Sequence, residues 1–144
     1  MPLRLIPDLH RATHQVGLYL ARLTKLGVDQ GEAHILSHLA GSGDCTIAEL
    51  HRALAHRRST LTSILDRLAE RKLLTREVSA RDRRMFTVRL TAHGKLLAAK
   101  VFQALEAVEK RVVRRAIRAD LQGFSRTVQA LEKTAREMSS PGKK

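Results

Sequence analysis

The segment 50–90 constrains the fold most, because a basic helical pattern, two alternating patterns and an Arg-rich break follow one another without interruption. Four apolar residues near its start recur at i, i+3, i+4 and i+7, which places them on one face of a helix: Leu61, Ile64, Leu65 and Leu68. The opposite face carries mainly short hydroxyl side chains, which suit close approach to base edges in a major groove. These polar residues are Ser59, Thr62, Ser63 and Asp66, with Thr60 and Arg67 at the edge. Taken alone, the segment would fit an ordinary amphipathic surface helix equally well.

The period then changes from helical to alternating. Apolar and polar residues alternate in 74–78 and again in 86–90, which predicts a two-stranded hairpin. The tip between them, 79–85, has three arginines around Asp82: Arg81, Arg83 and Arg84. A solvated loop is the alternative, but arginine is attracted to the potential of a narrow minor groove. Helix and hairpin together predict a winged helix, with the helix in the major groove of DNA and the hairpin in the minor groove.

The remainder of the chain is predicted to be helical. Asp29-x-x-Glu32 and Thr46-x-x-Glu49 are capping boxes before apolar periodic runs, so each marks a helix start. Other helices are expected from Pro7 to Lys25, from a Thr91 cap through Ile117, and from Asp120 to Met138. Their apolar surface exceeds what one winged helix can cover, which predicts a homodimer. The expected interface residues are Leu9, Leu105, Val108, Val112, Leu121, Phe124 and Val128.

At 144 residues the chain has the length of a single domain. The predicted class is mainly α with a small β-hairpin wing: a winged helix-turn-helix DNA-binding lobe plus a helical dimerisation region. We place the lobe at 29–90, the dimerisation region at 1–28 and 91–140, and a basic tail at 141–144.

The net charge of +13 is unevenly distributed. Residues 51–90 hold 11 basic and 4 acidic side chains, whereas residues 1–50 hold 4 and 5. This distribution predicts a double-stranded DNA partner. No stretch is apolar enough for a membrane, and aromatic residues at 3% are too few to stack on unpaired RNA bases. An enzyme is disfavoured because no nucleophile with a partnered base and no phosphate-binding glycine loop is found. A non-specific architectural DNA binder remains the alternative.

The run 58–76, the wing motif Asp82-Arg83-Arg84, and Leu90-Thr91 followed by Gly94 resemble the MarR family of bacterial winged-helix transcription regulators. The resemblance covers nearly the whole chain. It implies a homodimeric regulator, predicted to be a repressor, that binds a pseudo-palindromic operator. It also implies release from DNA by a small-molecule effector or an oxidant.

The resemblance also assigns residues. It implies DNA contacts from Arg57, Arg58, Ser59, Thr60, Thr62, Ser63 and Arg67 on the helix and from Arg81, Arg83 and Arg84 on the wing. Asp66 and Asp82 are expected to position the wing, with an ion pair between Asp66 and Arg84. The chain departs from the family at Ala55, His56 and Arg57, where Gly-Val and a capping Asp or Ser are common. Because arginine cannot cap a helix N-terminus, the sequence does not fix where this helix starts.

Cys45 is the chain's one cysteine, so no disulfide can form within it. A lone thiol favours a reducing, cytoplasmic setting, and the N-terminus lacks the apolar region of a signal peptide. The predicted DNA-binding function would associate the protein with the nucleoid. Redox-sensing relatives carry their cysteine in the first helix. We therefore interpret Cys45 as a small packed residue.

Two histidine pairs, His10 with His14 and His34 with His38, have the i, i+4 spacing that can ligate a metal ion. Neither has an obvious third ligand and HExxH is absent, so neither a metal nor any other cofactor is expected. The resemblance implies an effector pocket between the dimer helices and the DNA-binding lobe, with candidate residues His14, Leu18, Tyr19, His34 and His38. Such a pocket would be mostly aliphatic, and the positive chain would favour an organic anion.

Overall fold

The computed structural model describes residues 2–140, apart from the side chains of residues 23 and 24. The chain forms two compact units, Met1–Ala104 and Leu105–Lys144. The boundary lies inside a long helix, and the first helix belongs to the same unit as the expected DNA-binding lobe. The basic tail proposed at 141–144 lies outside the described residues.

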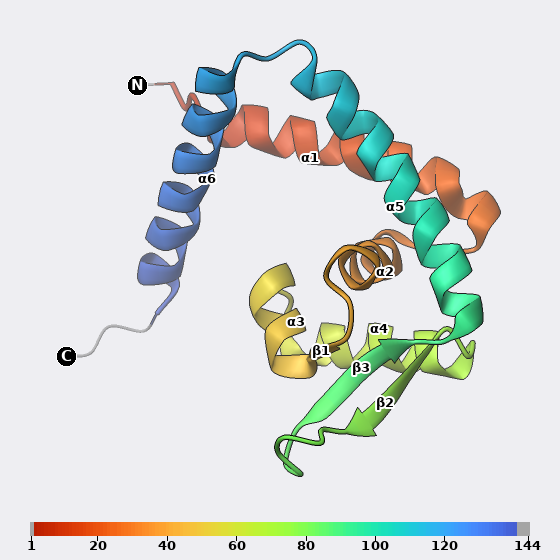
Figure 1. Ribbon diagram of the computed structural model, residues 1–144. Coiled ribbons are helices and arrows are strands. Elements are labelled where there is room, and N and C mark those ends of the chain that lie inside the picture. Colours follow the sequence, from red (N-terminus) through yellow and green to blue (C-terminus); the bar gives the residue numbers. More distant parts are fainter. Residues whose placement is uncertain (1, 141–144) are drawn as a thin grey trace. The chain divides into compact units, whose positions relative to one another are not determined.

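The first unit contains a helical N-terminal part, a winged helix and the start of the next long helix (Figure 1). Its elements are α1 (Ile6–Ala21), the 3-10 helix η1 (Arg22–Leu26), α2 (Gln30–Ser42), β1 (Cys45–Thr46), α3 (Ile47–Leu54), α4 (Arg58–Glu70), β2 (Leu74–Val78) and β3 (Phe86–Leu90), followed by the part of α5 (Ala92–Val113) that ends at Ala104. The predicted mainly α class with a small β-hairpin wing is therefore confirmed.

Local polar contacts explain where these helices start. Both predicted capping boxes are present at α2 and α3, so each start is fixed by a reciprocal pair of side chain to backbone hydrogen bonds. Thr91 starts α5, where its Oγ1 accepts from the Gly94 N–H at 3.0 Å and donates to the Lys72 carbonyl at 2.7 Å. Gly94 is required there, because a Cβ would lie 1.8 Å from the carbonyl oxygen of Leu73.

Helix α4 has the predicted amphipathic placement. Its four apolar residues are all buried and form the centre of the core: Leu61, Ile64, Leu65 and Leu68. Arg57 is the N-cap residue and makes no capping hydrogen bond, as expected for its side chain. The preceding Ala55 has φ +52°, the left-handed conformation that ends α3.

A three-stranded antiparallel sheet with the order β1-β3-β2 carries the wing. Leu74 pairs with Leu90 at the base of the hairpin, and both side chains are buried. Val78 pairs with Phe86 at the far end, and both are about half exposed. The hairpin therefore extends beyond the core and carries its tip, 79–85, into solvent.

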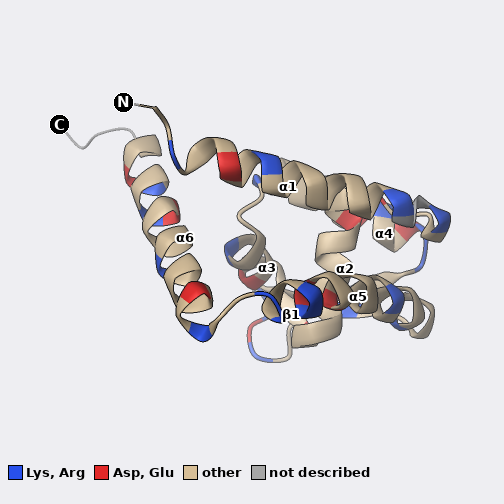
Figure 2. Ribbon diagram, turned by 90° about the horizontal axis from the view of Figure 1, so that it is seen from above, with Lys and Arg blue, Asp and Glu red and all other residues tan. Residues whose placement is uncertain are grey.

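The second unit holds the end of α5 and helix α6 (Arg118–Ser139). The sequence pattern carried α5 through Ile117, which was wrong: α5 ends at Val113. Ile117 instead precedes α6, and its backbone N–H donates to the Asp120 carboxylate at 3.1 Å. Both charge signs occur along α6 (Figure 2). Within residues 2–140, the helices include none that is long and apolar enough to cross a membrane.

Candidate nucleic-acid interface

The first half of α4 presents a hydroxyl-rich face to solvent. Ser59, Thr60, Thr62 and Ser63 are exposed, while the intervening Leu61 is 1% exposed and anchors this turn in the core. Arg57 and Arg58 lie exposed at the start of the same helix. Short donors and acceptors on a rigid helix are suited to reading base edges in a major groove.

The wing tip is a turn held by its own backbone and side-chain hydrogen bonds. The Ser79 N–H donates to the Met85 carbonyl at 2.7 Å and closes the loop. The Asp82 carboxylate accepts from the Arg84 N–H at 2.9 Å, so Asp82 shapes the tip. The guanidinium groups of Arg81, Arg83 and Arg84 thus extend from a defined loop.

The start of α4 and the wing meet at a groove of about 480 Å³. Its lining includes Arg58 and Thr62 from α4, Arg84 and Phe86 from the wing, and Arg52 from α3. The fold therefore brings together two sets of residues that the sequence assigned separately to the same function. Arg52 was missed, because a basic residue in the last turn of a helix is common for electrostatic reasons alone.

Positive charge on this surface is not neutralised by ion pairing. The ion pairs found among residues 2–140 include none of the arginines at the start of α4 or on the wing tip, namely Arg57, Arg58, Arg81, Arg83 and Arg84. Such a cluster favours a polyanion such as the DNA backbone.

The expected ion pair between Asp66 and Arg84 is not formed. The Asp66 carboxylate accepts instead from Arg76, with an N–O distance of 2.6 Å. Arg76 pairs with Val88 in the hairpin and so lies on its core-facing side, near α4, whereas Arg84 lies beyond the last strand pair. Asp66 therefore fastens the base of the wing to α4 through Arg76.

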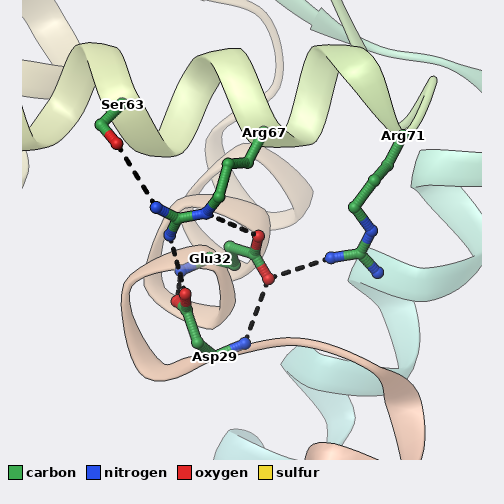
Figure 3. A network of polar contacts seen from close by, with 5 residues as sticks. All are labelled: Asp29, Glu32, Ser63, Arg67 and Arg71. Carbon is green, nitrogen blue, oxygen red and sulfur yellow. Dashed lines mark hydrogen bonds and ion pairs between the residues drawn. The ribbon is translucent and has the colours of Figure 1, made fainter.

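Arg67 has a different environment from the other expected DNA contacts (Figure 3). Its guanidinium donates to Asp29 at 2.7 Å, to Glu32 at 3.4 Å and to Ser63 at 3.4 Å. Glu32 also accepts from Arg71 at 3.0 Å. Arg67 thus connects α4 to the first turn of α2, a role that the sequence did not reveal.

The five candidate effector residues do not line one pocket. His14 and Leu18 line a groove of about 400 Å³ together with His10 and Gln30. Tyr19 instead donates its hydroxyl to the Ala104 carbonyl at 3.2 Å. His34 and His38 are half-buried on α2 and do not line that groove. Burial, and secondarily the nearby His56, lowers the pKa of His34.

The first histidine pair is stacked, with the ring centroids of His10 and His14 6.4 Å apart. In the described part of the chain, no three His, Cys, Asp or Glu side chains come together as metal ligands would. Cys45 is buried in β1, and burial, followed by Glu49 and Asp44, raises the pKa of its thiol to about 11. The interpretation of Cys45 as a packed residue is confirmed.

Comparison with known proteins agrees with this arrangement. Residues 26–85 match the sequence model described as the MarR family. The chain is 35% identical over 96 residues to the exopolysaccharide II synthesis transcriptional activator ExpG of Rhizobium meliloti, covering 65% of this chain and 50% of that protein. It is 26% identical over 92 residues to the HTH-type transcriptional repressor MdtR of Bacillus subtilis, covering 64% and 59%. The chain therefore spans about half to three fifths of the length of these relatives.

Solved structures show the same fold. S. aureus MepR in its DNA-binding conformation superposes with a TM-score of 0.84 at 18% identity, covering 92% of this chain and 99% of MepR. The MepR–DNA complex gives a TM-score of 0.77 at 18% identity, covering 93% and 99%. Residues 26–85 therefore carry the sequence pattern of the MarR family, and the chain shares the fold of MepR.

Proposed function

We propose that this protein is a homodimeric, sequence-specific DNA-binding transcription regulator. The observation that carries the proposal is the groove at which the hydroxyl-rich start of α4 meets the Arg-tipped wing. The major groove of a DNA duplex can accept the start of α4, and the adjacent minor groove can accept the arginines of the wing. The MepR–DNA complex supports this proposal through its shared fold.

In this proposal the two elements have different tasks. Ser59, Thr60, Thr62 and Ser63 contact base edges, whereas Arg57 and Arg58 contact phosphates beside them. Arg81, Arg83 and Arg84 enter or flank the minor groove. Arg52 adds a phosphate contact from α3. Arg67 is not in this set, because its donors are directed to α2 and Ser63.

A homodimer follows from the apolar surface of the second unit. Helix α6 contains no buried residue, although Leu121, Phe124 and Val128 recur on one face. Val112 on α5 is 55% exposed and Phe124 is 62% exposed. In a two-fold homodimer that binds a pseudo-palindromic operator, the two copies of α4 would reach half-sites about one DNA turn, roughly 34 Å, apart.

We further propose that the protein acts as a repressor in the cytoplasm, on nucleoid DNA, and that an organic anion releases it. The name of MdtR supports repression, whereas that of ExpG denotes an activator. The groove lined by His10, His14, Leu18 and Gln30 is where we place the effector, because histidine and amide donors there can bind a carboxylate.

The decisive test is selection of bound duplexes from a random pool at near-physiological salt, followed by sequencing. We expect pseudo-palindromes with half-sites about ten base pairs apart. Binding without enrichment, which weakens steeply as salt rises, would instead identify a non-specific architectural DNA binder.

A further inference from the structure

We propose that Glu32 is a positioning residue for sequence recognition, and this inference rests on the proposed function. Glu32 lies in the first turn of α2, and its side-chain hydrogen bonds are to Asp29, Arg67 and Arg71, not to the hydroxyl residues of α4 or to the wing tip. It acts through Arg67, which it holds against Ser63 on α4. The first turn of α2 thereby fixes both the placement of α4 and the orientation of one base-reading hydroxyl.

All four carboxylate oxygens of Asp29 and Glu32 are engaged (Figure 3). One Asp29 oxygen accepts the Glu32 N–H at 2.8 Å, and the other accepts Arg67 at 2.7 Å. Glu32 Oε2 accepts the Asp29 N–H at 3.1 Å and Arg71 at 3.0 Å, while Oε1 accepts Arg67 at 3.4 Å. The same groups therefore cap α2 and attach it to α4 at Arg67 and at the C-cap residue Arg71.

Stability alone does not account for Glu32. Glu32 is 4% exposed, and within residues 2–140 no other charged residue is buried. A buried ion pair costs so much desolvation that an apolar replacement is often neutral or stabilising. An apolar residue makes no directional hydrogen bonds, so it cannot fix the rotation of a partner helix.

The first turn of α2 packs tightly against α4. A Cβ added at Gly31 would lie 2.7 Å from Cδ1 of Ile64 on α4. Little space is left for the two helices to shift relative to each other here. The polar network beside this contact therefore sets the angle and register of α4.

Arg67 extends the network to the DNA surface. Its guanidinium donates to Ser63 Oγ at 3.4 Å. Because Oγ accepts this bond, the hydroxyl proton is available for donation to an acceptor on a base edge. In the major groove such acceptors are N7 and O6 of guanine, N7 of adenine and O4 of thymine.

The test measures affinity for a selected operator and for random duplex, at several salt concentrations, in wild type, Glu32→Gln and Arg67→Gln. We expect both variants to lower the operator-to-random affinity ratio by about fivefold or more, as loss of discrimination at one base pair does. Arg67→Gln should leave the salt dependence unchanged. It is also the variant safer for folding, since Arg67 is exposed and the Glu32–Arg71 pair stays intact.

Glu49→Gln is the matched control, because Glu49 occupies the same capping-box position in α3 but forms no ion pair among the described residues. Its charge acts on the nearby Arg52 and Arg81, so its loss should change the affinity for both duplexes alike. We expect its affinity ratio to equal that of wild type. An unchanged ratio in Arg67→Gln would overturn the inference. A uniform loss on both duplexes with a shallower salt dependence would also overturn it, by making Arg67 a phosphate contact. A wild type that does not discriminate would refute the proposed function itself, and this inference with it.

Discussion

Cys45 shows how burial controls the chemistry of one residue. Its thiol has a pKa of about 11 in the fold, against an ordinary value of 9.0, because burial disfavours the thiolate. Below pH 9 both the folded and the unfolded state keep the proton. Between about pH 9 and pH 11 only the unfolded state loses it, so the folded state loses stability relative to the unfolded state.

We therefore expect the free energy of unfolding of wild type, relative to Cys45→Ala, to fall as pH rises through this window. The fall should not exceed about 2 to 3 kcal/mol, because one pKa unit corresponds to about 1.4 kcal/mol. Urea denaturation of both proteins at a series of pH values measures the difference. Subtracting the free energy of unfolding of Cys45→Ala from that of wild type removes the contributions of other titrating groups. A pH-independent difference would contradict the raised pKa.

The sequence predicts the burial of residues more accurately than it predicts the partners in ion pairs. The apolar face of α4 follows from spacing alone, and all four of its residues are buried. The partners of Asp66 and Arg67 depend on how α4 lies against the hairpin and against α2, and spacing along one chain does not encode those angles. Arg76 therefore takes the place expected for Arg84, and Arg67 pairs with Asp29 and Glu32, which the sequence did not indicate.

At the scale of elements, the helix starts that a side chain caps were predicted well, whereas the end of α5 was not. The capping boxes of α2 and α3 and the Thr91 cap are all found. The turn between α5 and α6 contains no glycine or proline, and its apolar spacing continues the helical pattern, so the sequence gives no signal that α5 stops at Val113. The Asp120 contact that starts α6 is visible only in three dimensions.

The end of α3 offers a test of backbone strain within one element. Ala55 has φ +52°, a conformation that costs a non-glycine residue about 1 kcal/mol or more. We expect Ala55→Gly to stabilise the protein by about 0.5 kcal/mol, because relief of strain exceeds the added entropy of the unfolded chain. Ala53→Gly, inside the same helix, should destabilise it by about 0.5 to 1 kcal/mol. Denaturation of both variants checks the opposite signs, and a loss of stability in Ala55→Gly would refute the strain argument.

At the scale of the whole molecule, the exposed apolar residues of the second unit are the feature that a single chain leaves unexplained. Val112, Ile117 and Phe124 are each more than half exposed. Helix α6 holds four basic and three acidic residues, so its net charge is small (Figure 2). Together these features favour association of like chains over a monomer.

We expect the double variant Leu105→Glu, Val112→Glu to sediment at the mass of one chain, 16.1 kDa, and wild type at twice that mass. Two buried carboxylates at the interface would cost more than the apolar contact gains. Operator affinity should fall when the dimer dissociates, because the two half-sites would then be bound by separate chains and not by two linked copies. Gln103→Glu, an exposed substitution on the same helix outside the expected interface, should leave both mass and affinity unchanged. A double variant that stays dimeric would show that these residues do not form the interface, whereas a monomer that keeps full operator affinity would separate dimerisation from DNA recognition.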